Sequence, residues 1–126
     1  MPEPTAAESL KLAQDHLERA LAAATEPVDW TDLSTYGFYC LEAAVMAASG
    51  HLKLAGVQRS HPGKVGAAKL LANKHKLPDV SALLVELNTA RKAHAYGDVE
   101  APDLDEEELA SDLDAFVDAV KALIKK

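Results

Sequence analysis

The residues best suited to chemistry stand in one short stretch, LNTARKAHAYGD, at positions 87–98. Its candidate functional side chains are those of Asn88, Arg91, Lys92, His94 and Tyr96. On a helix, Arg91 and His94 are three residues apart and therefore face the same side. An arginine can hold a phosphate through two hydrogen bonds, and a histidine exchanges protons near neutral pH. With a nearby acid, the pair would suffice to cleave a phosphodiester bond by attack of the ribose 2′-hydroxyl.

The same pair also fits an ordinary helix end. Arg91 and His94 continue the apolar stripe formed by Leu84 and Leu87, and long polar side chains commonly extend from such a stripe into water. The sequence leaves both interpretations open.

Metal and cofactor sites are not indicated elsewhere. The sequence contains no C-x-x-C or H-E-x-x-H motif of the kind that binds zinc. Its histidines are His16, His51, His61, His75 and His94. The segment HPGK has one glycine before Lys64 and no preceding strand, so it does not predict a phosphate-binding loop. We therefore expect no metal and no cofactor.

Cysteine usage and hydropathy bear on the compartment. The one cysteine, Cys40, lies in an apolar run, where core packing is the expected role. A single thiol cannot form an internal disulfide, which suits a reducing cytosol. The first residues lack the layout of a signal peptide, and no stretch reaches the roughly 18 apolar residues of a membrane span. We expect a cytoplasmic protein without a membrane segment.

Charge is unevenly distributed along the chain, whose net charge is -7. Residues 53–92 hold eight bases and two acids, whereas residues 98–118 hold ten acids and no base. An acidic protein is a poor general binder of nucleic acid, but the basic middle could form one surface for anions. Lys74 and Lys92 are candidate contributors to that surface. A solvated helix face is the alternative.

Helical periodicity and capping signals divide the chain into five segments. A composition of 48% hydrophobic and 5% aromatic residues also favours packed helices over a sheet. The predicted helices begin at a capping box of Thr5 and Glu8, at about Thr31, at Pro62, at Asp79, and after an acidic connector at 98–108. The second helix is expected to end at Ala55, before Gly56, and the fourth helix at Gly97. We predict an all-α antiparallel bundle of about five helices in a single domain, 1–126, with its core at about 5–124.

The second predicted helix carries one formal charge, Glu42, between Asp32 and Lys53. A helix that is apolar nearly all round should be central in the bundle. An unpaired buried carboxylate is costly, so Glu42 should lie either on a polar strip or in an interior pair. Arg91 is the candidate partner, with Glu42 as its supporting acid.

Two stretches, YGFYCLEAAVMAASGHLKLAG and LNTARKAHAYGD, resemble the HEPN superfamily (higher eukaryote and prokaryote nucleotide-binding domain) within residues 29–124. Its members are small helical bundles, usually dimeric, found in toxin–antitoxin pairs, beside minimal nucleotidyltransferases and in RNA-cleaving defence enzymes. The resemblance implies that Arg91 is the motif arginine and that Lys92 takes the polar position. Tyr96 stands where the family's histidine is usual.

That tyrosine implies a degenerate ribonuclease motif, because a side chain with an ordinary pKa of about 10 is a weak base at neutral pH. His94 is closer to Arg91 than the family spacing. A second alignment matches His94 and Tyr96 to the His-x-Tyr of a toxin subset and places Thr89 at the arginine position.

We therefore expect a dimeric HEPN-like module that binds RNA, a nucleotide or a partner's acidic surface without efficient cleavage. Its ligand-binding residues would be Asn88, Arg91, Lys92 and Lys74. One rival is a metal-independent ribonuclease toxin with an antitoxin partner, in which Arg91, His94 and Tyr96 are catalytic. Another is a protein-interaction subunit paired with a minimal nucleotidyltransferase.

Overall fold

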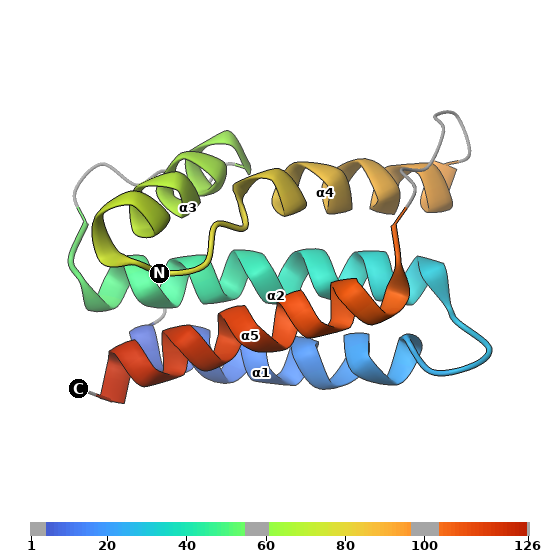
Figure 1. Ribbon diagram of the computed structural model, residues 1–126, viewed down its shortest axis with the longest axis horizontal. Helices are drawn as coiled ribbons and strands as arrows, with labels where there is room; N and C mark the ends of the chain where they lie inside the picture. The colour runs from blue at the N-terminus through green and yellow to red at the C-terminus, as the bar shows by residue number, and fades with distance from the viewer. Residues whose placement is uncertain (1–4, 55–60, 97–103, 126) are drawn as a thin grey trace.

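The computed structural model describes residues 5–54, 61–96 and 104–125. These ranges contain five α-helices and no strand: α1 (Ala6–Ala23), α2 (Trp30–His51), α3 (His61–His75), α4 (Ser81–Tyr96) and α5 (Glu106–Lys125). As Figure 1 shows, α1 and α5 lie on one side of α2, and α3 and α4 lie on the other. The predicted all-α bundle is confirmed.

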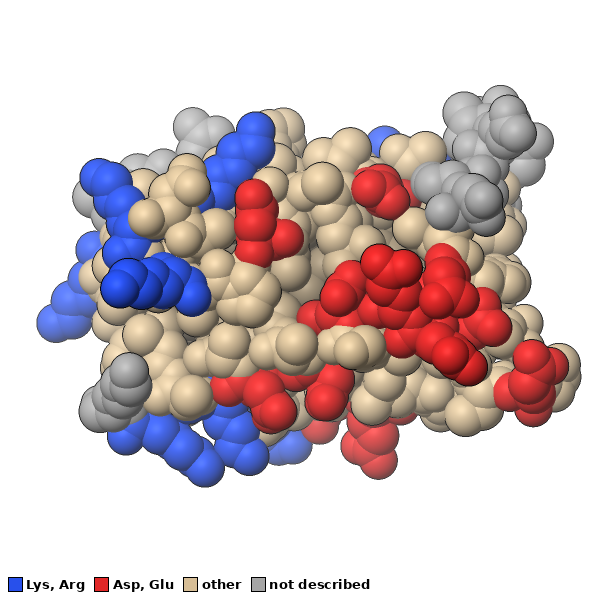
Figure 2. Space-filling model, in the orientation of Figure 1, with Lys and Arg blue, Asp and Glu red and all other residues tan. Residues whose placement is uncertain are grey.

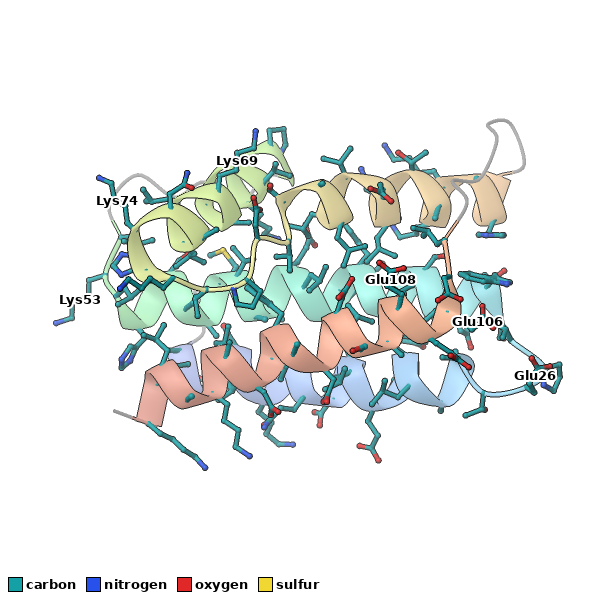
Figure 3. The ribbon with its side chains drawn as sticks, in the orientation of Figure 1. Glu26, Lys53, Lys69, Lys74, Glu106 and Glu108 are labelled. Carbon is teal, nitrogen blue, oxygen red and sulfur yellow. The ribbon has the colours of Figure 1, made fainter. Side chains whose placement is uncertain are left out.

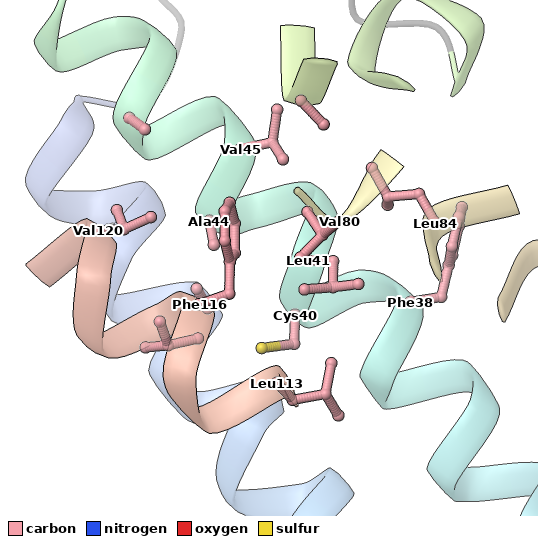
Figure 4. Packing of buried hydrophobic residues seen from close by; sticks show 14 of the residues in the cluster. Phe38, Cys40, Leu41, Ala44, Val45, Val80, Leu84, Leu113, Phe116 and Val120 are labelled. Carbon is pink, nitrogen blue, oxygen red and sulfur yellow. The ribbon is translucent and has the colours of Figure 1, made fainter. Parts of the chain in front are cut away.

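Helix α2 is the centre of the bundle, as its apolar composition predicts. It packs against each of the other four described helices, and Leu33, Cys40, Leu41 and Val45 on it are fully buried. The close view in Figure 4 shows this core where α2 meets Leu84 of α4 and Phe116 of α5. Because α2 is shared by all the packing layers, its side chains connect helices that do not touch one another.

The starts of α1, α4 and α5 are fixed by side chains that accept backbone N–H bonds. Thr5 Oγ1 accepts from Glu8 N at 3.1 Å, and Glu8 Oε1 accepts from Thr5 N at 3.0 Å, which confirms the capping box. Asp79 Oδ1 accepts from Ser81 N at 2.9 Å. Helix α5 begins at Glu106, inside the predicted connector, because Asp105 Oδ2 accepts from Glu108 N at 3.2 Å and acids suit a helix N-terminus.

Helix α2 ends at His51, four residues before the predicted end at Ala55. Lys53 adopts a left-handed conformation with φ 54. Lys53 N donates to Gly50 O at 3.2 Å and Leu54 N to Ser49 O at 3.0 Å, the paired bonds of a Schellman motif. Leu54 then packs against the core, which offsets the cost of a lysine where glycine is usual. Gly56, Gly97 and residues 98–103 of the connector lie outside the described residues.

Candidate functional site

Arg91 is positioned by two contacts near the C-terminal end of α4. Its guanidinium carbon lies 5.0 Å from the centroid of the Phe38 ring on α2. Its Nη2 donates to Asn88 Oδ1 at 2.8 Å. Asn88 is one turn earlier on the same helix, so the two predicted site residues do come together.

The charge of Arg91 is not neutralised within the described ranges. No carboxylate there lies within ion-pair distance of it, and its buried Nε has no hydrogen-bond partner in the part of the chain that the structure describes. An arginine laid on a ring and held by a neutral amide keeps a fixed direction and its full charge. This is the arrangement expected of a group that receives an anion.

The other residues predicted for this site are more dispersed. Lys92 and His94 are exposed on the last turns of α4. Tyr96 is the last residue of that helix. Lys74 is on the last turn of α3. Figure 3 places Lys74 at the end of the molecule opposite the C-terminal end of α4. The structure thus joins Asn88 to Arg91 but not Lys74.

Glu42 forms a half-buried ion pair, but its partner is Lys64 and not the candidate Arg91. Lys64 Nζ of α3 lies 3.4 Å from Glu42 Oε2, and both side chains are only 16% exposed. Since α3 packs on α2, Lys64 reaches the carboxylate there. Arg91 instead covers Phe38, one helical turn before Glu42. Glu42 therefore does not act as the supporting acid of Arg91 by an ion pair.

A row of rings extends from Phe38 across α2 to α1. Phe38 and Tyr39 have ring centroids 5.9 Å apart, Tyr39 and His16 5.5 Å, and His16 and Tyr36 5.9 Å. Arg19 ends the row, 5.4 Å from the Tyr36 centroid, with Nη1 3.4 Å from the Tyr36 hydroxyl. We call Arg19, Tyr36, His16, Tyr39, Phe38 and Arg91 the aromatic row. It carries an arginine at each end.

The middle of the aromatic row borders a pocket of about 160 Å³ that is lined by residues of α1, α2 and α3. The pocket is lined by Ser9, Leu12, His16, Tyr39, Glu42, Ala43, Met46 and Lys64. Leu12 and Tyr39 are 49% and 39% exposed, so both side chains are accessible from the pocket. Desolvation, followed by the charge of Arg19, lowers the pKa of His16 below its ordinary value of 6.5. The pocket therefore combines accessible rings, a neutral imidazole at pH 7 and a half-buried ion pair.

A second, acidic groove of about 310 Å³ lies between α4 and α5. Its lining includes the acidic residues Asp79, Glu86, Asp105, Glu108 and Asp112, and Figure 2 shows red side chains gathered over this side. In the described ranges no group of three or more His, Cys, Asp or Glu side chains could hold a metal ion. The groove shares no residue with the aromatic row.

Cys40 is a core residue, as predicted. It is fully buried, and desolvation raises the pKa of its thiol to about 12. A thiol with that pKa stays protonated and is a poor nucleophile.

Sequence reasoning missed most of the aromatic row. Tyr36, Phe38 and Tyr39 read as part of an apolar helix, and His16 and Arg19 lie on another helix far away in sequence. A signal was present, because two of the three tyrosines and one of the two phenylalanines stand within four residues of each other. The contact with α1 could come only from the fold.

Over the ranges that the structure describes, the chain is an all-α domain of five helices. Its site is the aromatic row, which has an arginine at each end. Comparisons with family models, curated proteins and solved structures found no match. None of the described helices is long and apolar enough to cross a membrane.

Proposed function

We propose that the chain is a HEPN-like binding module for nucleotides or single-stranded RNA, acting without efficient cleavage. Arg91 receives a phosphate, and the accessible rings of the aromatic row receive bases. The observation that carries the proposal is Arg91 itself, fixed by Phe38 and Asn88 and left without a carboxylate partner among the described residues.

The chemistry of the row supports this ligand class. Proteins bind single-stranded nucleic acid by stacking bases on aromatic and arginine side chains beside a positively charged group. Tyr39 is 39% exposed and can take a base, whereas Phe38 is buried and supports Arg91 from below. Arg19 at the other end of the row offers a second positive charge.

The alternative function, that of a ribonuclease toxin, has weaker support. Glu42 is bound to Lys64 rather than Arg91, so the motif lacks its expected acid. His94 is exposed and is the remaining candidate base. General acid–base help is typically worth about 10²–10⁴-fold in rate, so we expect weak cleavage or none.

The module is proposed to form a homodimer. The support is the HEPN resemblance, whose members are usually dimeric, together with Val85 of α4, a large apolar residue outside the pocket that stays exposed. Light scattering at micromolar concentration should give twice the chain mass of 13.4 kDa. A strictly monomeric mass would contradict it. If the chain instead pairs with a nucleotidyltransferase or an antitoxin, its measured mass should rise only when that partner protein is added.

The central test is binding of fluorescently labelled single-stranded RNA, measured by anisotropy, for wild type and Arg91→Ala. Loss of a charge-assisted contact to phosphate should weaken binding by about tenfold to a hundredfold. Lys125→Ala is the matched control, because it removes one positive charge at the end of α5. Equal affinity of wild type and Arg91→Ala, or no binding by wild type, would refute the proposal.

Gel analysis of the same samples tests the rival. RNA cleavage that disappears in both Arg91→Ala and His94→Ala would establish the ribonuclease function instead.

A further inference from the structure

The pocket beside the aromatic row is lined by a positive group, a negative group and two rings. Lys64 Nζ and Glu42 Oε2 are 3.4 Å apart, and the accessible ring of Tyr39 and the imidazole of His16 line the same pocket. Leu12, Ala43 and Met46 supply apolar contacts. A ligand that fits must therefore be flat, partly apolar on its faces, and polar along one edge.

We propose that this pocket takes a guanine base, which lies against Tyr39 and His16 and directs its Watson–Crick edge at Glu42 and Lys64. The inference rests on the proposed function, since it names the base that the nucleotide- or RNA-binding site selects. The pocket and Arg91 are connected through the contact of Tyr39 with Phe38, so one nucleotide or a short strand could occupy both.

The order of hydrogen-bonding groups selects guanine. Its Watson–Crick edge presents an acceptor, O6, followed by two donors, N1–H and N2–H₂. A lysine ammonium only donates and a carboxylate only accepts, so Lys64 matches O6 while the two oxygens of Glu42 match the two donors. Adenine, cytosine and uracil each place an acceptor opposite one of the carboxylate oxygens, where it is repelled.

The ion pair also suits a neutral ligand. With Lys64 and Glu42 neutralising each other, a base can enter without leaving a net charge buried. Both side chains are 16% exposed, so hydrogen bonds made to them are less weakened by competing water than bonds at the surface. Selectivity should therefore come from the edge of the base, and affinity from the rings and from Arg91.

The test is isothermal titration calorimetry of the wild-type protein with guanosine, inosine, adenosine, cytidine and uridine monophosphates. Inosine lacks only the N2 amino group, so it should bind about tenfold more weakly than guanosine monophosphate. The other three should bind more weakly still. Glu42→Gln should remove most of this preference, because an amide offers one acceptor and introduces donors. Glu18→Gln is the matched control, since that exposed carboxylate of α1 lies outside the pocket.

The outcomes separate this inference from the proposed function. Equal affinity for all five nucleotides, with binding lost in Arg91→Ala, overturns the guanine pocket and leaves nucleotide binding in place. Selective binding of the uncharged nucleoside guanosine that Arg91→Ala does not change supports the pocket alone. Absence of binding by every nucleotide and nucleoside overturns the guanine pocket, whereas the proposed function is decided separately by the binding of single-stranded RNA. If Glu42→Gln does not fold, the comparison of guanosine with inosine monophosphate on wild type decides by itself.

Discussion

His16 is the residue whose protonation should matter most to the aromatic row. Its ring contacts both Tyr36 and Tyr39, and desolvation, then Arg19, lowers its pKa, with Asp15 acting in the opposite direction. In the unfolded chain the pKa returns to its ordinary value near 6.5. Between the folded and unfolded pKa values the unfolded chain binds more protons, so the folded state loses stability as pH falls.

The prediction is that His16 contributes to a loss of stability below about pH 6.5. Urea unfolding at pH 7.5 and pH 5.5 should show a smaller drop in the free energy of unfolding for His16→Phe than for wild type. Phenylalanine keeps a ring in the row but cannot take up a proton. An identical drop in both proteins would show that His16 titrates with the same pKa in the folded and unfolded states.

At the scale of elements, the close approach of α2 to its neighbours depends on Gly37. A Cβ at this position would lie 3.3 Å from Leu113 Cδ1 of α5 and 3.6 Å from Leu87 Cδ1 of α4. Both leucines are fully buried, so they have little room to move. Gly66 of α3 has no atom within 4 Å of the corresponding position.

These two glycines therefore predict opposite results. Gly66→Ala should stabilise the protein by about 0.5–1 kcal/mol, the gain of alanine over glycine within a helix. Gly37→Ala makes the same gain, but overpacking typically costs about 1–3 kcal/mol, so its net effect should be destabilising. Chemical denaturation of both variants measures the difference. A Gly37→Ala protein as stable as Gly66→Ala would mean that the two leucines repack freely.

The helices were predictable from sequence because their signals are local. The capping box at Thr5, the cap at Asp79 and the apolar pattern of α2 each depend on neighbours within a few residues. The end of α2 was predicted wrongly because Lys53, rather than a glycine, adopts the left-handed conformation. The partner of Glu42 was missed for another reason, since Lys64 reaches it only through the packing of α3 on α2. Contacts between helices decide the site, and no local pattern encodes them.

At the scale of the whole molecule, charge is separated along the long axis. Figure 3 places Lys53, Lys69 and Lys74 toward one end and Glu26, Glu106 and Glu108 toward the other. Helix α4 carries Arg91 away from the lysine-rich end: ten residues separate Ser81 from Arg91, a rise of roughly 15 Å. Lys74 is further back, at the end of α3. A ligand must therefore be long to contact both Arg91 and Lys74.

This separation predicts that Lys74 matters to a strand and not to a single nucleotide. Lys74→Ala should leave the affinity for a nucleoside monophosphate unchanged, but it should weaken binding of a single-stranded RNA of roughly 15 nucleotides. It should also reduce the slope of log affinity against log salt by about 0.7, the value for one phosphate contact on a single strand. Lys92→Ala is the comparison at the other end of the molecule, because Lys92 is exposed near the C-terminal end of α4, on a different side of the helix from Arg91, and its loss should weaken RNA binding there. If Lys74→Ala weakened binding of the nucleotide and of the RNA equally, or weakened neither, the RNA strand would not run from Arg91 to the lysine-rich end.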